Sequence, residues 1–250
     1  MTRFVAFAFL IVMGSGSLGA LFESAIADDL ADCERTGGDK QIQACSRIIE
    51  SGLLSGKPIS KKNLAAAYNN RGRAYGETGA LDRAISDYNA AIRLNPDFAT
   101  AYYNRGVAYG DSGEVERAIA DFDNAIQRNS QYATAYNNRG IAYQFKGDLD
   151  GAIADYDMAI KLNPEYATAY NNRGDAYEKK GDLQRAAADY SKALSLDPAH
   201  KAAAYNLQNL EKQPSKESPP ATAAPLEAGK PGGDTTSHQV EGSTGLDASD

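Results

Sequence analysis

The stretch YNNRG at residues 68–72 returns as YYNRG at residues 102–106, and then unchanged at residues 136–140 and 170–174. The step between successive copies is 34 residues. A fixed period of this length, with small and aromatic residues at set offsets, predicts helix-turn-helix units that stack on one another. Four other rows of residues keep the same register: Tyr75, Tyr109, Tyr143 and Tyr177; Gly79, Gly113, Gly147 and Gly181; Ala84, Ala118, Ala152 and Ala186; and Tyr88, Phe122, Tyr156 and Tyr190.

On these residues the chain resembles the tetratricopeptide repeat (TPR) family. It departs from the family pattern at the seventh repeat position, where Arg replaces Leu, and at Ser130, which replaces a Pro. The resemblance implies an all-α fold, a right-handed superhelical TPR solenoid of four full repeats with an N-terminal cap hairpin and a C-terminal capping helix. It implies a module that binds a protein or peptide, but no particular activity, because proteins that share a fold do not have to share a function.

The period divides the chain into segments. The four repeats are expected at residues 65–98, 99–132, 133–166 and 167–200, preceded by a degenerate repeat at residues 28–64. Residues 201–213 are expected to form the capping helix, with Ala204, Tyr205, Leu207 and Leu210 covering the last hydrophobic face and Gln208, Glu211 and Lys212 in water. Residues 214–250 are rich in Pro, Ser, Gly, Thr and Ala, which predicts a disordered tail.

The N-terminus has the order of a secretory signal peptide. Arg3 precedes an apolar run at residues 4–13, and Ala25 and Ala27 flank Ile26 just before two aspartates. We therefore expect cleavage after Ala27 and a periplasmic or secreted protein of the bacterial envelope. The alternative is that residues 4–22 are retained as a membrane anchor, which would make the protein a tethered assembly element whose solenoid self-associates.

Residues 28–64 carry the only two cysteines, Cys33 and Cys45. They lie one on each of two expected helices, at residues 28–34 and 40–51. In an exported protein such a pair predicts a disulfide, which closes a loop of about 13 residues and contributes about 3 kcal/mol in the chain-entropy model. Two buried free thiols are the alternative. Residues 52–57 are expected to form a turn, and Ser60 to cap the next helix.

Composition excludes several classes of function. The net charge is -7, from 26 Lys and Arg against 33 Asp and Glu, and no basic stripe is present, so nucleic acid is not an expected partner. The two histidines, His200 and His238, lie far apart in the sequence and form no metal-ligand pattern. No nucleophile is paired with a base and no glycine loop fits a phosphate, so we expect no enzyme and no cofactor.

Arginine and aspartate recur sixteen residues apart in every repeat. In each repeat the first helix is expected over about fourteen positions, and the glycine at position fifteen marks the turn to the second. The spacing therefore joins the two helices, which favours a structural Arg-carboxylate ladder over a catalytic or anion-binding role. The pairs are Arg71 and Asp87, Arg105 and Asp121, Arg139 and Asp155, and Arg173 and Asp189.

One face of the first helices carries the candidate binding residues. Repeat positions two, six, nine and thirteen share this face, with position five at its edge. Position six is Asn in every repeat, at Asn70, Asn104, Asn138 and Asn172, and an apolar centre is expected from Tyr103, Val107, Ile141 and Phe145. An Asn side chain both donates and accepts, so this row can hold an extended peptide. Alternatively, the asparagines only bond neighbouring helices.

Overall fold

The computed structural model describes residues 29–35, 37–54 and 57–212. The predicted signal peptide and the predicted tail lie outside the described residues. Within them, residues 29–35 are helical, α2 (Gly38–Ser51) follows, and α11 (Lys201–Lys212) is the last helix. Between them run the first helices of the repeats, α3 (Lys61–Glu77), α5 (Ala99–Asp111), α7 (Ala133–Phe145) and α9 (Ala167–Lys179), and the second helices, α4 (Leu81–Leu94), α6 (Val115–Arg128), α8 (Leu149–Leu162) and α10 (Leu183–Leu196).

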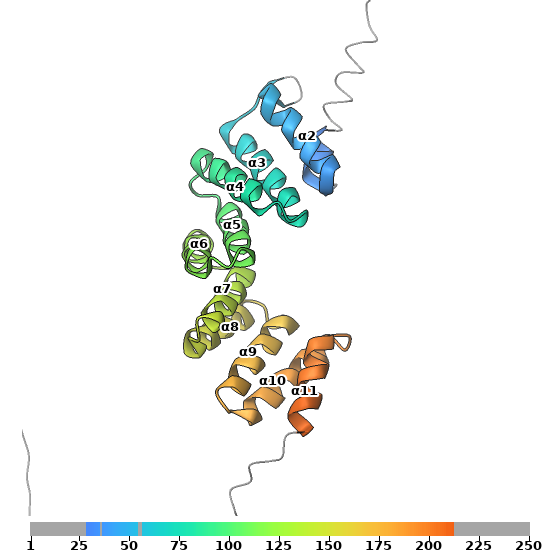
Figure 1. Cartoon of the computed structure of the whole chain (residues 1–250), viewed down its shortest axis with the longest axis vertical. Coiled ribbons are helices and arrows are strands. Elements are labelled where there is room, and N and C mark those ends of the chain that lie inside the picture. The colour runs from blue at the N-terminus through green and yellow to red at the C-terminus, as the bar shows by residue number, and fades with distance from the viewer. Residues whose placement is uncertain (1–28, 36, 55–56, 213–250) are drawn as a thin grey trace, which may run out of the picture. The chain divides into compact units, whose positions relative to one another are not determined.

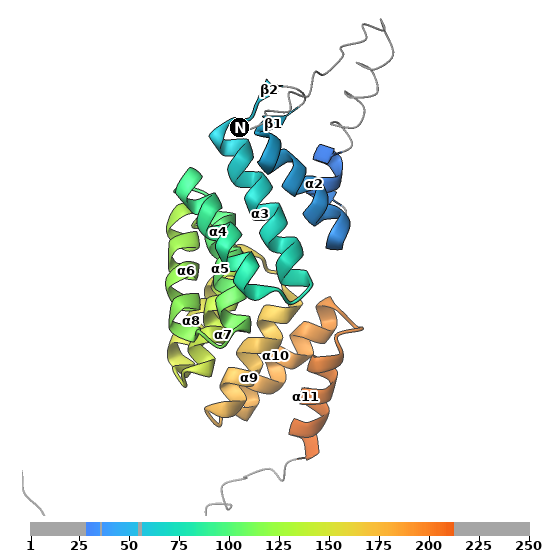
Figure 2. The same cartoon turned by 45° about the horizontal axis from the view of Figure 1, so that its top comes forward.

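Each helix packs on its neighbours in chain order, and successive first helices also touch one another (Figures 1 and 2). This arrangement confirms the predicted all-α solenoid. No helix in the described part of the chain is both long enough and apolar enough to cross a membrane.

Glycine is required at two kinds of position. Gly79 ends the turn between α3 and α4 with φ 77°, a left-handed conformation that side chains with a Cβ disfavour. Gly106 lies where α5 crosses α6, and a Cβ there would come within 2.8 Å of the Phe122 ring. The same contact with an aromatic ring of the second helix recurs at Gly72, Gly140 and Gly174, so the two helices of every repeat approach closely at this glycine.

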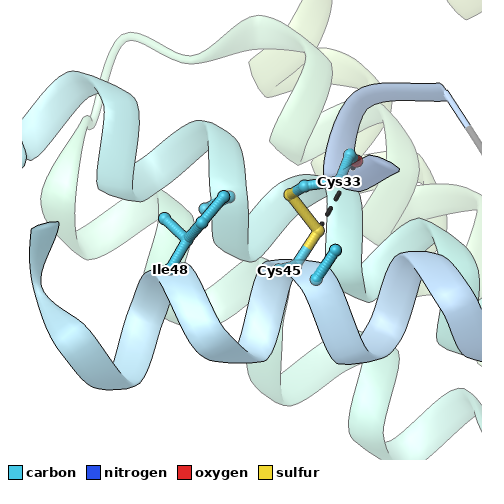
Figure 3. Packing of buried hydrophobic residues seen from close by; sticks show 5 residues of the cluster. Cys33, Cys45 and Ile48 are labelled. Atoms are coloured by element: carbon cyan, nitrogen blue, oxygen red, sulfur yellow. Dashed lines mark hydrogen bonds between the residues drawn. A yellow bond between two sulfur atoms is a disulfide. The ribbon is translucent and has the colours of Figure 1, made fainter. Parts of the chain in front are cut away.

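The cap is held by a disulfide between Cys33 and Cys45, with the two sulfurs 2.09 Å apart (Figure 3). Both cysteines are buried and pack with Ile48 of α2 and Ala67 of α3. Gln41 is fully buried beside them and donates a hydrogen bond from Nε2 to the Cys33 carbonyl at 2.8 Å. The disulfide therefore joins the helix at residues 29–35 to α2, and the apolar side chains around it pack this cap on the first repeat.

The connection to the first repeat differs from the expected turn. Residues 52–57 were expected to be a simple turn, but β1 (Leu53–Leu54) pairs antiparallel with β2 (Lys57–Pro58). Ser60 caps α3 as predicted, since its side chain accepts a hydrogen bond from the backbone N–H of Asn63. Because that cap lies before the repeat boundary at residue 65, α3 is longer than the other first helices.

The burial of α11 differs from the prediction. Leu210 is buried and Leu207 packs against the buried cluster that Leu210 forms with residues of α9 and α10, but Tyr205 is 66% exposed and Ala204 is also exposed. Counting the 34-residue period onward explains this, because Tyr205 is one period after Asn171 and so occupies repeat position five. That position contacts the following repeat, and no further helix is described beyond α11.

Candidate functional site

The arginine row has a structural use. Each Arg forms a two-pronged ion pair with the Asp of its own second helix; Arg139 reaches Asp155 with Nε–Oδ2 2.8 Å and Nη2–Oδ1 2.7 Å. Its third nitrogen, Nη1, donates to Asp123 of the preceding repeat at 2.5 Å. The hydrogen bonds that Arg139 donates to the Asp155 carboxylate raise the pKa of Arg139. The guanidinium is thus shared between two repeats.

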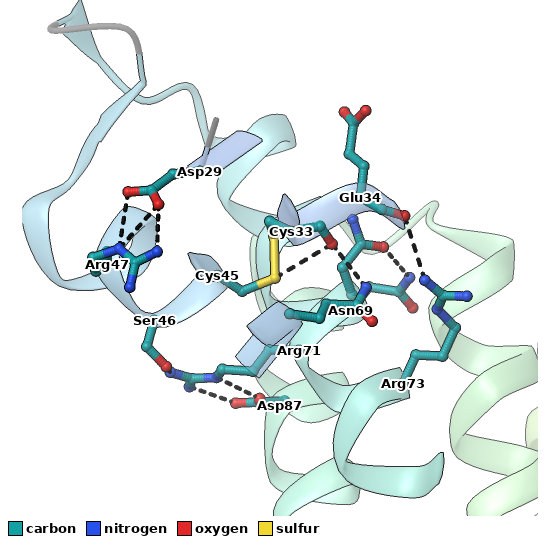
Figure 4. Close-up of a disulfide and its surroundings, with 12 residues drawn as sticks. Asp29, Cys33, Glu34, Cys45, Ser46, Arg47, Asn69, Arg71, Arg73 and Asp87 are labelled. Carbon is teal, nitrogen blue, oxygen red and sulfur yellow. Dashed lines mark hydrogen bonds and ion pairs between the residues drawn. A yellow bond between two sulfur atoms is a disulfide. The ribbon is translucent and has the colours of Figure 1, made fainter. Parts of the chain in front are cut away.

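The same arrangement extends to the cap, where Arg71 pairs with Asp87 and donates to the Ser46 hydroxyl at 3.0 Å (Figure 4). In repeats two and four the third nitrogen donates to Asn89 and Asp157, respectively. All four guanidinium groups therefore have their counter-charge inside the solenoid. The prediction of a structural ladder is confirmed.

The asparagine row also joins repeats. The amide of Asn104 donates to Asn69 at 2.9 Å, and the amide of Asn172 donates to Asn137 at 3.0 Å. In every such pair, position six of one repeat bonds position five of the repeat before it. Asn206 of α11, which is not among the predicted residues of the row, continues the row by donating to Asn171 at 3.2 Å. The sequence left open whether the asparagines bind a peptide or only bond neighbouring helices. The hydrogen bonds from position six to position five show that they bond neighbouring helices.

Part of each position-six Asn side chain remains accessible to solvent. These side chains are half-buried, whereas their partners Asn69, Asn137 and Asn171 are buried. Each lines one of four cavities on the first-helix face: Asn70 beside the cap, Asn104 between α3 and α5, Asn138 between α5 and α7, and Asn172 between α7 and α9. A primary amide carries two N–H groups, and Asn104, Asn138 and Asn172 each use one of them between the repeats. Contact between the other and a partner stays a prediction.

The cavity between α5 and α7 is the most apolar part of this face. Its volume is about 290 Å³, and it brings together Val107, Ile141 and Phe145 of the predicted apolar centre. Val115 and Phe122 of α6 form its wall, and the pattern on the first helices alone does not predict them. Phe145 is 80% exposed, the most exposed large apolar side chain of the described residues.

Tyr103, the fourth residue of the predicted apolar centre, does not line this cavity, although it packs against Phe122 of its wall with the ring centroids 5.9 Å apart. It lines the cavity between α3 and α5, also about 290 Å³ in volume, and its ring centroid is 4.9 Å from that of Tyr132. Its hydroxyl accepts a hydrogen bond from Asn138 at 3.0 Å. Burial raises the pKa of Tyr103. In repeat two this tyrosine thus takes the place that Asn69 and Asn137 hold elsewhere, as the acceptor for the next repeat.

Charged groups lie along the same face. Arg73 pairs with Glu77 at 3.7 Å, and Lys179 pairs with Asp175 at 2.7 Å. Gln144 also donates to Asp175. Asp111, the last residue of α5, lines both central cavities and has no hydrogen bond or ion pair to its carboxylate among the described residues. The residues described include no cluster of three or more His, Cys, Asp or Glu that could hold a metal.

Two family models match parts of the repeat region. A model described as "TPR repeat" matches residues 72–113 and 146–181, and one described as "Tetratricopeptide repeat" matches residues 99–132 and 167–200. The solenoid is built from tetratricopeptide repeats. A search of curated protein sequences gave no significant match.

Solved TPR structures share the fold. The crystal structure of MamA is 27% identical and covers 75% of this chain and 97% of its own, with a TM-score of 0.56. YrrB, described as a TPR protein with an unusual peptide-binding site, is 20% identical, covers 76% and 99%, and has a TM-score of 0.55. PilF of Pseudomonas aeruginosa is 21% identical, covers 61% and 69%, and has a TM-score of 0.57.

Proposed function

We propose that this protein is a non-catalytic scaffold that binds an extended segment of a partner protein along the first-helix face of its TPRs. The observation that carries the proposal is the α5–α7 cavity with the 80% exposed Phe145 at its edge. Apolar side chains around a concave site supply most of the energy of such contacts, because the anchor of the partner is removed from water there.

The polar residues around the cavity suit a main-chain ligand. Asn138 lines the cavity and is half-buried, so its amide group can meet a peptide group whatever side chain that residue carries. Neighbouring cavities of about 290 Å³ and 220 Å³ lie on either side, between α3 and α5 and between α7 and α9. A row of such cavities fits an extended segment better than a single small molecule.

The second part of the proposal is that the protein is exported. The residue order before Ala27 favours a cleaved signal peptide and a periplasmic or secreted location. The disulfide between Cys33 and Cys45 supports an oxidising compartment, where such bonds persist. Mass spectrometry of the protein from the cell envelope tests this directly. A mature N-terminus at Asp28 is expected, and an intact Met1 in the membrane fraction would favour the tethered alternative.

The binding proposal is tested by a photo-crosslinking amino acid placed at Phe145 or, as the control, at Lys192. Lys192 is exposed on the second helix α10, so the two positions differ in face but not in access to water. After irradiation in envelope extract, we expect one partner to crosslink at position 145 and not at position 192, and the Ile141→Ala change to weaken its capture. Equal capture at both positions would contradict binding at the first-helix face.

A further inference from the structure

Asp111 is an acidic group in an electrostatically unfavourable place. It is the C-terminal residue of α5, a helix with no basic residue in its last turn. The C-terminus of a helix carries partial negative charge, so a carboxylate there is repelled. The first helices of the other repeats avoid this at position thirteen: Glu77 is compensated by Arg73, Phe145 is uncharged, and Lys179 has the favourable sign.

The carboxylate is also exposed and uncompensated beside an apolar cavity. Asp111 lines the α5–α7 cavity together with Val107, Ile141 and Phe145, and it borders the α3–α5 cavity as well. Among the described residues no lysine or arginine pairs with it, whereas Glu77, which also lines the α3–α5 cavity, pairs with Arg73. A counter-charge for Asp111 would therefore come from outside the solenoid.

We propose that the α5–α7 cavity receives one large apolar side chain of the partner, and that Asp111 selects a lysine or arginine within two residues of that anchor. This proposal rests on the proposed function and names the chemistry of the segment bound. An extended chain advances about 3.3 Å per residue. Because Asp111 lines the same cavity as the anchor, a basic residue within two positions of the anchor, about 7 Å along the chain, is well placed to reach it.

Charge supports this choice of partner. The chain carries a net charge of -7, which favours approach of a cationic segment. The C-terminal residues of this chain do not have the required pattern. The large aliphatic residues between 214 and 250 are Leu226, Val240 and Leu246, and each is followed directly by Glu or Asp. An anchor from that segment would place a carboxylate beside Asp111, so residues 214–250 are a poor occupant and a segment of a partner protein suits the cavity better.

The test is selection of twelve-residue peptides from a random display library by the full chain. Four forms are compared: wild type, Asp111→Lys, Glu165→Lys and Phe145→Ala. Glu165 is the matched control, an exposed acid in the loop between α8 and α9 that lines none of the four cavities. Circular dichroism checks that all four forms keep the same helix content.

Wild type and Glu165→Lys are expected to enrich Leu, Ile, Phe or Met with Lys or Arg within two positions. Asp111→Lys is expected to keep the apolar preference and to enrich Asp or Glu beside it. For one selected peptide, Asp111→Asn should weaken binding about three- to fivefold, the effect of one exposed ion pair.

The other outcomes separate the two proposals. Two outcomes would overturn the role of Asp111 and leave the first-helix face as a binding site. One is enrichment of apolar residues without a basic neighbour. The other is a preference for basic residues that Asp111→Lys leaves unchanged. Two other outcomes would overturn the proposed function and this inference with it. In one, wild type and Phe145→Ala enrich the same apolar peptides. In the other, neither form enriches any peptide.

Discussion

Positions six and seven of the first helices are Asn and Arg in every repeat, whereas positions nine and thirteen differ in all four. The repeated pair is bonded across repeats: Asn104 reaches Asn69, and Arg139 bridges Asp155 and Asp123. The variable positions line the same cavities as the position-six asparagines, as Val107, Ile141 and Phe145 do. The difference indicates that the identical residues hold the stack together and leave only part of each Asn side chain to a partner, while the side chains that differ from repeat to repeat form the rest of that surface.

The largest effect should come from the repeated arginine. Arg139→Met leaves Asp155, whose side chain is 6% exposed, without its counter-charge. Breaking a buried pair in this way should lower the free energy of unfolding by about 3 kcal/mol. Arg73→Met is the matched change at position nine, where the pair with Glu77 is half exposed and contributes less than about 0.5 kcal/mol.

Urea unfolding followed by circular dichroism measures both changes. A double variant, Arg139→Met with Asp155→Leu, removes the buried charge along with its partner, so it should recover most of the stability lost in Arg139→Met. Equal losses for Arg139→Met and Arg73→Met would contradict the distinction between repeated and variable rows.

Two glycines of α5 sharpen the comparison. A Cβ at Gly106 would lie 2.8 Å from Cε1 of the buried Phe122 ring and 3.2 Å from the Asp121 Cβ, whereas a Cβ at Gly110 would meet nothing within 4 Å. Gly106→Ala should therefore cost about 2 kcal/mol through overpacking. Gly110→Ala should raise stability by about 0.5 kcal/mol, because alanine favours the helix. Midpoints of urea unfolding decide the sign of each change, and a stable Gly106→Ala would mean that α5 and α6 can move apart.

The buried asparagines should give the next effect. Asn137 is 2% exposed, donates to Asn138 and accepts from Asn172. Asn137→Ala removes both hydrogen bonds and should lower stability by about 1.5 kcal/mol. Asn209→Ala at position nine of α11 removes no side-chain hydrogen bond within the described residues and should change stability by less than about 0.5 kcal/mol. Hydrogen exchange of the α7 and α9 amides would show whether the loss lies at that junction, and unchanged protection there would count against the asparagine link.

Much of this architecture could be predicted from the period alone. Helix packing, the left-handed glycine at Gly79 and the Arg71–Asp87 pairing each follow from residues at a constant offset. The third bond of Arg139 to Asp123 could not be predicted in the same way, because it depends on how closely one repeat stacks on the next. Spacing within a repeat says nothing about that distance.

Other features were missed although a signal was present. One more step of 34 residues from Asn172 leads to Asn206, and from Arg173 to Leu207. Following that step would have assigned Asn206 to the asparagine row and would have left Tyr205 exposed, as observed. The cavity wall at Val115 and Phe122 had no such signal, because it depends on where the second helix α6 lies beneath α5 and α7.

The smallest effect on stability, and the largest on binding, is expected at Phe145. The side chain is 80% exposed, so Phe145→Ala removes little buried area and should change the free energy of unfolding by less than about 0.5 kcal/mol. If the α5–α7 cavity anchors the partner, the same change should weaken binding about tenfold or more, since truncating an interface anchor removes apolar area that only the complex buries. Phe145→Leu keeps most of that area and should retain most of the affinity. Fluorescence anisotropy with a selected peptide measures the affinities. If Phe145→Ala bound as tightly as wild type at unchanged stability, the variation at positions nine and thirteen would have to be explained without a ligand, and the exposed faces of the second helices would become the surface to test.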